Sequence, residues 1–422
     1  MSIHAGIEAM NVYGGVAFLD VAKLARHRGL DTARFENLLM KQKTVALPCE
    51  DAVSYGVNAA APIVDGLSPA EQGRIEMLVT CTESGIDFAK SLSTYLHHHL
   101  GLHRNCRLFE LKNACYSGVA GLQMAVQFVL SQTSPGAKAL VVATDLSRLI
   151  LSADEQSNLK GDWAFTEPSG GSGAVAMLVS ECPHVFEVDV GANGYYGYEV
   201  MDACRPFPDG DAGDADLSLL SYLDCLENAY LGYQERVANV DYATTFSYLA
   251  FHTPFGGMVK GAHRMMMRKN TKADAATVQA DFERRVAPGM IYCQRVGNIM
   301  GASTALSLAS TIDHGSFTEP RRIGCFSYGS GCCSEFFSGI VTAEGQRRLR
   351  QLAIARHLDQ RYELSLEQYE AILRGTDAVR FGVRNHRLDA GLMREARSAV
   401  AGSRRLVLKE IKDYHREYEW VS

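Results

Sequence analysis

The segment Asn113-Ala114-Cys115-Tyr116-Ser117-Gly118 joins two apolar patterns of different period. A short apolar run precedes it and apolar residues at helical spacing follow it, which predicts a strand and then a helix with Cys115 in its first turn. These flanking residues are Leu108, Phe109 and Leu111 before the segment and Val119, Leu122, Val126 and Val129 after it. Unpaired N–H groups and the helix dipole favour a thiolate at that position, so we expect a lowered pKa and a nucleophilic thiol. A buried structural cysteine is the alternative.

Composition indicates one ordinary globular protein. The chain has 422 residues, of which 47% are hydrophobic and 21% charged. Its first residues show no basic segment followed by an apolar run, and no apolar stretch reaches the roughly 20 residues that a membrane span needs. We therefore expect a cytoplasmic protein without a membrane partner. The net charge of −6, with no basic stripe interleaved with aromatic residues, argues against nucleic-acid binding.

The cysteines and histidines indicate neither a disulfide framework nor a metal site. The eleven cysteines are scattered, include the neighbours Cys332 and Cys333, and form no pair with zinc-ligand spacing, so we expect them to be reduced. His97, His98 and His99 lie close to His103 in the sequence, but three consecutive side chains on a helix diverge and no carboxylate or cysteine set lies nearby.

Strand and helix patterns alternate along the chain, which is typical of an α/β fold. We expect strands at 77–82, 139–144, 174–179, 246–251, 322–327, 335–342 and 405–411, and helices at 88–100, from 115, 218–233, from 258 and after 298. Polar loops are expected at 153–161 and 206–216. No linker interrupts the pattern, so we expect one compact unit of two similar halves, residues 1–180 and 181–422.

Four further residues lie where strands end or helices begin. Glu83 follows an apolar run and is a candidate general base or acid. His252 ends another strand and Asn298 heads a helix, so both are candidate hydrogen-bond donors to a substrate carbonyl. Ser330, in a glycine-rich bend, can direct a backbone N–H at an oxyanion. The alternatives are a solvated glutamate, a structural histidine, an N-cap and a hairpin turn.

Taken in order, these segments resemble the 3-hydroxy-3-methylglutaryl-CoA synthase family of the thiolase superfamily. The resemblance extends over nearly the whole chain. It rests on Glu83 and on the motifs at 113–118, 252–255, 297–303 and 326–331, with support from the glycine loop at 170–176 and the tail at 413–416.

This resemblance implies a five-layered αβαβα fold, a homodimer and an acyl transfer without a bound cofactor. Cys115 would take an acetyl group from a thioester, and Glu83 would remove a Cα proton so that the enolate adds to a β-ketone. His252 and Asn298 would bind carbonyl oxygens of the acceptor, and the N–H groups of Cys115 and Ser330 would stabilise the enolate. Water would then hydrolyse the enzyme thioester. The resemblance further implies substrate contacts at Gly171, Pro254, Ser303, Tyr328 and Gly329.

Departures from the mevalonate-pathway members favour a carrier protein over CoA. Those enzymes usually have a CoA-binding lysine where this chain has Gly257. Lys260, Arg264 and Arg268 follow at helical spacing and form a candidate docking stripe for an acidic carrier protein, although a solvated helix face is the alternative. The loop at 149–164 is longer than in those enzymes and is a candidate lid. Further candidate contacts to the carrier protein or its phosphopantetheine are Arg34, Lys41 and Lys43.

The segments 6–15 and 47–51 look most like the branch of the family that works in polyketide assembly lines. The predicted function is therefore β-branching, with acetyl from a donor acyl carrier protein and a β-ketoacyl acceptor on a second carrier protein, each held by phosphopantetheine. Three alternatives remain open: a mevalonate-type enzyme that uses acetyl-CoA and acetoacetyl-CoA, a decarboxylative condensing enzyme, and a non-catalytic scaffold that docks carrier proteins.

Overall fold

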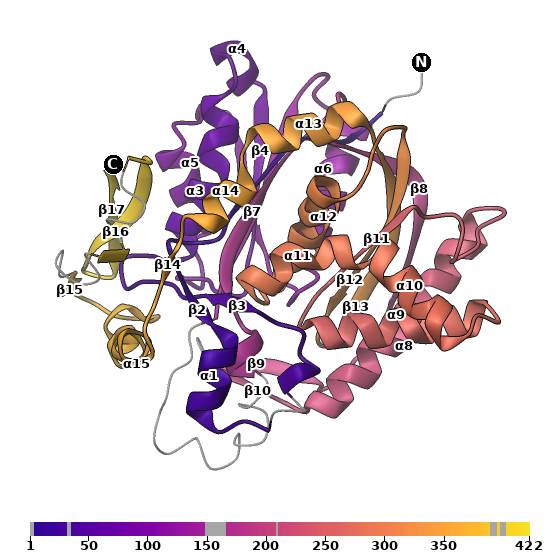
Figure 1. Ribbon diagram of the computed structural model, residues 1–422. Coiled ribbons are helices and arrows are strands. Elements are labelled where there is room, and N and C mark those ends of the chain that lie inside the picture. The colour runs from indigo at the N-terminus through magenta and orange to yellow at the C-terminus, as the bar shows by residue number, and fades with distance from the viewer. Residues whose placement is uncertain (1–3, 32–34, 148–165, 208–209, 389–394, 397–401) are drawn as a thin grey trace.

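A mixed sheet of nine strands runs through the computed structural model, which describes residues 4–31, 35–147, 166–207, 210–388, 395–396 and 402–422 (Figure 1). Five of its strands come from the first 180 residues and four from the remainder. The order across the sheet is β11 (Tyr248–Phe251), β12 (Arg321–Gly329), β13 (Cys333–Val341), β8 (Phe186–Gly197), β1 (Gly6–Tyr13), β7 (Ser172–Ser180), β6 (Lys138–Leu146), β4 (Ile75–Cys81) and β5 (Arg107–Leu111).

Among the described residues, the strand pairing between the two groups is that of β1 with β8, through Gly6 opposite Glu187 and Ile7 opposite Phe186. The division predicted at residue 180 falls between β7 and β8. We propose that residues 1–180 and 181–422 form the two halves, because the strand pairing between them is much shorter than the strand pairing within either.

Helices cover both faces of each group of strands. One core cluster lies under α3 (Ala52–Asp65) and α5 (Ser93–His99), and another lies under α8 (Ala215–Arg236), α9 (Gly256–Asn270) and α10 (Ala275–Arg285). A third cluster joins both groups of strands through α6 (Ser117–Ser131), α11 (Ala287–Val296) and α12 (Ser303–His314). Alternate residues of β6, such as Leu140 and Val141, face different clusters, as a strand buried on both faces requires. The two groups of strands therefore form two layers of the fold. Helices lie between these layers and on the outer face of each, which gives the five-layered αβαβα order that the resemblance predicts.

The described residues contain further elements. They are α1 (Val21–Arg28), α4 (Pro69–Gln72), α13 (Ala343–Gln351), α14 (Ile354–Asp359), α15 (Leu366–Gly375), the 3-10 turns η1 (Met300–Ala302) and η2 (Thr376–Val379), and the strands β2 (Ala17–Asp20), β3 (Gln42–Thr44), β9 (Ala203–Phe207), β10 (Gly210–Gly213), β14 (Tyr362–Glu363), β15 (His386–Arg387), β16 (Arg405–Lys412) and β17 (His415–Val421).

Several predicted boundaries need correction. The helix expected at 88–100 begins only at Ser93, and the loop expected at 206–216 contains the end of β9, all of β10 and the start of α8. The predicted final strand is followed by a further one, β17, with Asp413 and Tyr414 at the turn between them. The predicted loop at 153–161 and the whole of the candidate lid at 149–164 lie outside the described residues.

One described segment is long and apolar enough to cross a membrane by length and composition. It is Ala114–Ser131, which contains α6, and α6 packs against β4, β6, β7 and α12 inside the molecule. A core helix satisfies the same test, so this segment is weak evidence for a membrane span.

The parallel strands bring the candidate residues to common edges of the sheet. Strands β4, β5 and β6 are parallel to one another, and β11 is parallel to β12. Glu83 and Cys115 follow the carboxyl ends of β4 and β5, whereas His252 and Ser330 follow those of β11 and β12. Sites in α/β folds form at such carboxyl ends.

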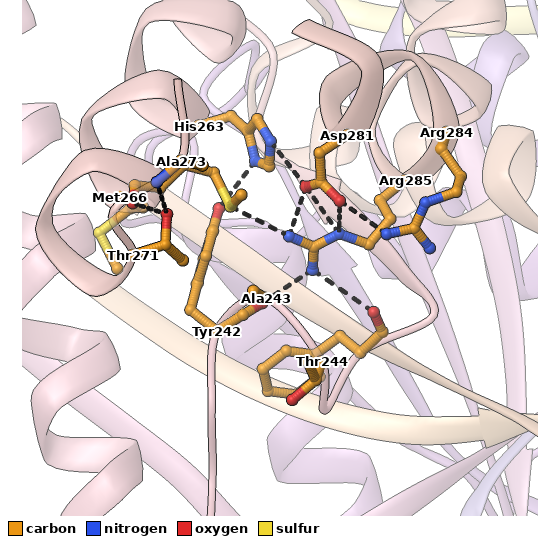
Figure 2. Close-up of polar contacts among 12 residues, drawn as sticks. Tyr242, Ala243, Thr244, His263, Met266, Thr271, Ala273, Asp281, Arg284 and Arg285 are labelled. Carbon is orange, nitrogen blue, oxygen red and sulfur yellow. Dashed lines mark hydrogen bonds and ion pairs between the residues drawn. The ribbon is translucent and has the colours of Figure 1, made fainter. Parts of the chain in front are cut away.

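A buried ionic cluster fastens α9 and α10 to the segment that leads into β11 (Figure 2). The Arg285 guanidinium donates to the Asp281 carboxylate through Nε and Nη2, at 2.6–2.9 Å, and through Nη1 to the Tyr242 carbonyl oxygen at 2.8 Å. His263 Nε2 lies 3.1 Å from Asp281 Oδ2, and neither His263 nor Arg285 has exposed surface. Because His252 lies between β11 and α9, the cluster fixes both ends of the segment that carries it.

Removing the charge of Asp281 should destabilise the fold. Asp281→Asn leaves the buried Arg285 without a counter-charge, and breaking such a pair costs about 3–5 kcal/mol, which thermal unfolding would detect as a clear fall in Tm. Glu283→Gln, on the exposed face of the same helix, removes the same charge and should change Tm little. Equal Tm values for the two variants would contradict the assignment.

The fall in Tm that Asp281→Asn causes should become smaller as the pH is lowered. Burial opposes ionisation of Asp281, but the neighbouring His263 and Arg285 outweigh it and hold the pKa of this carboxyl well below its usual value. A carboxyl whose pKa is lowered on folding contributes stability above its unfolded pKa, and this contribution is lost as the pH falls through the folded pKa. The difference in Tm between wild type and Asp281→Asn should therefore be full at neutral pH and shrink below about pH 4.

Candidate active site

Cys115 lies in a tight turn between β5 and α6, two residues before the helix begins at Ser117. The N–H groups of Tyr116 and Ser117 donate to the carbonyl oxygens of Asn113 and Ala114, at 3.1 and 3.2 Å, and Ala114 has a φ of +43°. The prediction that Cys115 occupies the first helical turn is wrong, because apolar spacing indicates a helix without fixing its first residue.

The pKa of the Cys115 thiol is raised well above its ordinary value, not lowered. Burial is the largest cause, and the carboxylates of Glu83 and Asp145 add to it, whereas Arg205 acts in the opposite direction. The predicted lowering is therefore wrong: desolvation and two negative neighbours outweigh the start of the helix. Cys115 is a protonated thiol at neutral pH, so any nucleophilic step must remove its proton.

Glu83 brings a carboxylate to this thiol. Its Oε1 lies 3.6 Å from Cys115 Sγ, within hydrogen-bonding range for sulfur. Arg205 on β9 holds the glutamate: one guanidinium nitrogen donates to the Glu83 carbonyl oxygen at 2.8 Å, and another lies 3.5 Å from Oε2. No sequence pattern marks Arg205, because it is 122 residues from Glu83 and borders a segment predicted as a polar loop.

Asp145, at the end of β6, is the second residue that the sequence prediction missed. Its carboxylate is fully buried and accepts five hydrogen bonds of 2.8–3.1 Å. Oδ1 accepts from the hydroxyl of Thr82, the N–H of Glu83, and the N–H and hydroxyl of Ser84, while Oδ2 accepts from the N–H of Gly301. Burial raises the pKa of Asp145 despite these donors. One carboxylate thus joins the Glu83 loop to the segment after Asn298.

His252 is enclosed and uncharged. It is 1% exposed, and burial lowers its pKa to about 3, so the imidazole is neutral at physiological pH. Its backbone is fixed, since its N–H donates to the Phe326 carbonyl oxygen at 2.7 Å and its own carbonyl oxygen accepts from the Tyr222 hydroxyl at 2.7 Å. Its ring Nδ1 has no hydrogen-bond partner among the described residues. The imidazole therefore suits a neutral hydrogen-bonding role towards a bound molecule.

Asn298 is oriented by its own neighbours. Its side-chain oxygen accepts from the N–H of Met300 at 3.0 Å and from the hydroxyl of Ser303 at 2.9 Å, which leaves the amide nitrogen as the donor group. Gly171 packs against the same turn, where its N–H donates to the Asn298 carbonyl at 2.9 Å and a Cβ would lie 2.0 Å from the Val296 carbonyl oxygen. Ser303 is 1% exposed and Gly171 is buried. The hydrogen bonds that both residues donate to Asn298 hold it in position. Their predicted substrate contacts stay untested.

The Ser330 turn lies directly against the Cys115 segment. A Cβ at Gly329 would lie 2.7 Å from the backbone nitrogen of Tyr116, so only glycine permits this approach. Asp202 holds the turn, because it accepts from the Tyr328 hydroxyl at 2.5 Å and from the Gly331 N–H at 2.8 Å. Tyr328 is 3% exposed and its hydroxyl donates to Asp202, so its side chain supports the turn.

The candidate contacts for a carrier protein divide into three groups. Lys260, Arg264 and Arg268 are all exposed on α9, and Lys41 is exposed as well. Lys43 is 2% exposed and donates to the Glu167 carbonyl oxygen, so the prediction that it lies at a contact surface is wrong. Arg34 lies outside the described residues.

Gly257 has no room for a side chain. A Cβ there would lie 1.9 Å from the carbonyl oxygen of Asn37. The segment around Asn37 therefore closes over the position where mevalonate-pathway members are expected to have a lysine. Pro254, partly buried, lies between His252 and the start of α9.

Together these residues form a candidate site for acyl transfer through a thiol. The Cys115 thiol, the adjacent Glu83 carboxylate and the Asn298 amide lie on loops that contact one another. No group of three or more metal-ligating His, Cys, Asp or Glu side chains occurs in the part of the chain that the structure describes.

Comparison with known proteins identifies the family of the chain. The family model described as hydroxymethylglutaryl-coenzyme A synthase N terminal matches residues 2–183, and the C-terminal model of the same name matches residues 264–387. The chain is 63% identical, over 100% of both sequences, to the polyketide biosynthesis 3-hydroxy-3-methylglutaryl-ACP synthase PksG of Bacillus subtilis. It is 32% identical to the hydroxymethylglutaryl-CoA synthase of Enterococcus faecalis, over 88% of this chain and 92% of that one.

Among solved structures, the curacin biosynthetic pathway HMG synthase in complex with acetyl donor-ACP matches with a TM-score of 0.95 and 63% identity. The match covers 99% of this chain and 100% of that one. The fold, the order of the motifs and the contacts around Cys115 lead to the same conclusion as these similarities: the chain belongs to the hydroxymethylglutaryl-coenzyme A synthase family of acyltransferases.

Proposed function

We propose that this chain is a hydroxymethylglutaryl synthase of polyketide biosynthesis that acts on acyl groups attached to acyl carrier proteins. Cys115 takes an acetyl group from a donor carrier protein, and the acetyl enolate adds to the β-ketone of an acyl chain on an acceptor carrier protein. Hydrolysis of the thioester to Cys115 then releases the branched product. The observation that carries the proposal is the Glu83 carboxylate 3.6 Å from the Cys115 thiol, in a chain 63% identical along its full length to a protein named for this activity.

Each residue has a role that follows from its surroundings. Glu83 accepts the thiol proton and later removes the Cα proton of acetyl-Cys115. His252, which is neutral, and the amide nitrogen of Asn298 bind carbonyl oxygens of the acceptor. The backbone N–H groups of Cys115 and Ser330 stabilise the enolate oxygen, since the Ser330 turn packs against the Cys115 turn.

A carrier protein is favoured over CoA by two observations. Gly257 leaves no space for a lysine that would bind CoA, and the basic stripe of Lys260, Arg264 and Arg268 is exposed. The stripe suits an acidic partner. The homodimer that the resemblance implies is also proposed; β5, at the edge of the sheet, offers a strand for pairing with a second copy.

The first prediction concerns loading. Brief exposure to acetylated carrier protein should add one acetyl group to Cys115, detected by intact-protein and peptide mass spectrometry, and Cys115→Ala should gain none. Loading should need a far lower concentration of the carrier protein than of acetyl-CoA. Equal or better loading from acetyl-CoA would favour the mevalonate-type enzyme, and no loading from either would remove Cys115 as nucleophile.

The second prediction separates the two roles of Glu83. Glu83→Gln should slow condensation by about a hundredfold or more, because no carboxylate remains to remove the Cα proton. The same change should speed alkylation of Cys115 by iodoacetamide, because losing a negative neighbour lowers the thiol pKa.

Alkylation of wild-type Cys115 should in turn rise about tenfold per pH unit across the neutral range, since only the thiolate reacts and the thiol pKa lies well above neutrality. Exposed Cys182 in the same sample provides an internal control for the Glu83 variant. Slower alkylation of Cys115 in Glu83→Gln would contradict the electrostatic assignment.

The third prediction tests the basic stripe. Reversing Lys260, Arg264 and Arg268 to glutamate should raise KM for acetyl carrier protein roughly tenfold, because each exposed charge contributes at most about 1 kcal/mol. Loading from acetyl-CoA should be unchanged. Arg374→Glu is the control, because Arg374 is exposed on α15, which lies at the left of Figure 1 whereas α9 lies at the right. An unchanged KM in the triple variant would exclude the stripe as a docking surface.

A further inference from the structure

Glu335 is a buried carboxylate near the site to which the proposed mechanism gives no role. It lies on β13, is 2% exposed, and has its pKa raised by burial. Its Oε2 accepts from the Tyr116 hydroxyl at 2.7 Å, and its Oε1 accepts from the Asn193 side chain at 3.1 Å. A carboxylate enclosed in this way holds its donors in fixed directions, because an unpaired buried charge is costly.

Tyr116 is the residue that follows Cys115. Its phenol reaches across to Glu335, and its backbone packs on the other side against Gly329, where a Cβ would lie 2.7 Å from the Tyr116 nitrogen. Tyr116 therefore contacts both β13, which follows Ser330, and Gly329, which precedes it. A substitution can remove the phenol contact without changing the backbone contact.

Glu335 is itself held from the opposite side. Arg236 on α8 donates to the Asn193 side-chain oxygen at 3.0 Å and to the Tyr195 hydroxyl at 2.7 Å, and its guanidinium lies 4.4 Å from the Tyr195 ring centroid. A continuous chain of hydrogen bonds thus runs from Arg236 through Asn193 and Glu335 to Tyr116. It links α8 and β8 to the residue beside the thiol.

The thiol needs an external support of this kind. Cys115 lies before the first turn of α6, in a turn where Ala114 has a positive φ, so the regular hydrogen bonds of the helix do not hold it. Its Sγ must nevertheless stay 3.6 Å from Glu83, which comes from a different loop. Misplacing reacting groups by about 1 Å can cost a hundredfold in rate.

We propose that Glu335 is a positioning residue that acts through the Tyr116 hydroxyl to keep Cys115 aligned with Glu83 and the Ser330 turn. The inference rests on the proposed function, because it takes Cys115 as the nucleophile. It concerns the condensation step most, since proton removal from acetyl-Cys115 needs Glu83 and the enolate-binding N–H groups in place together. Binding of the donor carrier protein does not depend on it.

Tyr116→Phe tests the inference because it removes only the hydroxyl that Glu335 holds. Tyr233→Phe is the matched control: Tyr233 is also buried, and its hydroxyl bonds to Ser338 on the same strand, three residues beyond Glu335. Each enzyme is acetylated on Cys115, mixed with acetoacetyl carrier protein, and followed by mass spectrometry. KM for the acetyl donor and Tm are measured in parallel.

We expect Tyr116→Phe to slow condensation at least about tenfold with a donor KM within twofold of wild type, and Tyr233→Phe to condense normally with a similar change in Tm. Glu335→Gln, whose amide oxygen still accepts from Tyr116, should stay within about threefold of wild type. Glu335→Ala should resemble Tyr116→Phe, and combining the two should cause no further loss.

Condensation by Tyr116→Phe within twofold of wild type would overturn the inference, as would an equal loss in Tyr233→Phe. Wild-type enzyme that does not acetylate Cys115 at all would instead remove the proposed function, and this inference with it. Because loading and condensation are measured separately, the two failures are distinguishable.

Discussion

The buried carboxylate of Asp145 is the interaction on which the geometry of the site depends. It has no exposed surface, and it accepts hydrogen bonds from the Glu83 loop on one oxygen and from Gly301 on the other. The loop that carries Glu83 and the segment that begins with Asn298 are thereby fixed to one group. Loss of the carboxylate would leave several buried N–H and O–H groups without an acceptor, which costs more than the hydrogen bonds themselves contribute.

Backbone contact brings the remaining loops to the thiol. A Cβ at Gly118 would lie 2.1 Å from the carbonyl oxygen of Gly301, and one at Gly329 would lie 2.7 Å from the nitrogen of Tyr116. At these crossings two main chains meet without side chains between them. The site is therefore assembled from loops that follow strands of both groups, at a separation that any larger residue would increase, and this explains why its motifs are rich in glycine.

Sequence patterns predicted the local elements and the ends of strands but not the long-range contacts. The apolar run before Glu83 and the one before His252 are local signals, and both residues lie where those signals placed them. Arg205 gave no such signal, because its contact with Glu83 joins positions 122 residues apart. Lys43 is a charged residue, and its type alone predicts a place on the surface. Packing buries it instead, and its ammonium donates to the Glu167 carbonyl oxygen. Burial of a single polar side chain is set by the tertiary structure.

The raised pKa of Cys115 follows from the same contacts and constrains the proposed mechanism. A helix start favours the thiolate, but desolvation and the nearby Glu83 and Asp145 oppose it more strongly, so the resting thiol keeps its proton. Glu83 must take that proton during loading and pass it to the departing phosphopantetheine thiolate, because only an ionised Glu83 can then remove the Cα proton. His252, with a pKa near 3, is too weak a base to replace it. Arg205 places a positive charge 3.5 Å from Glu83 Oε2 and so holds this carboxylate in place.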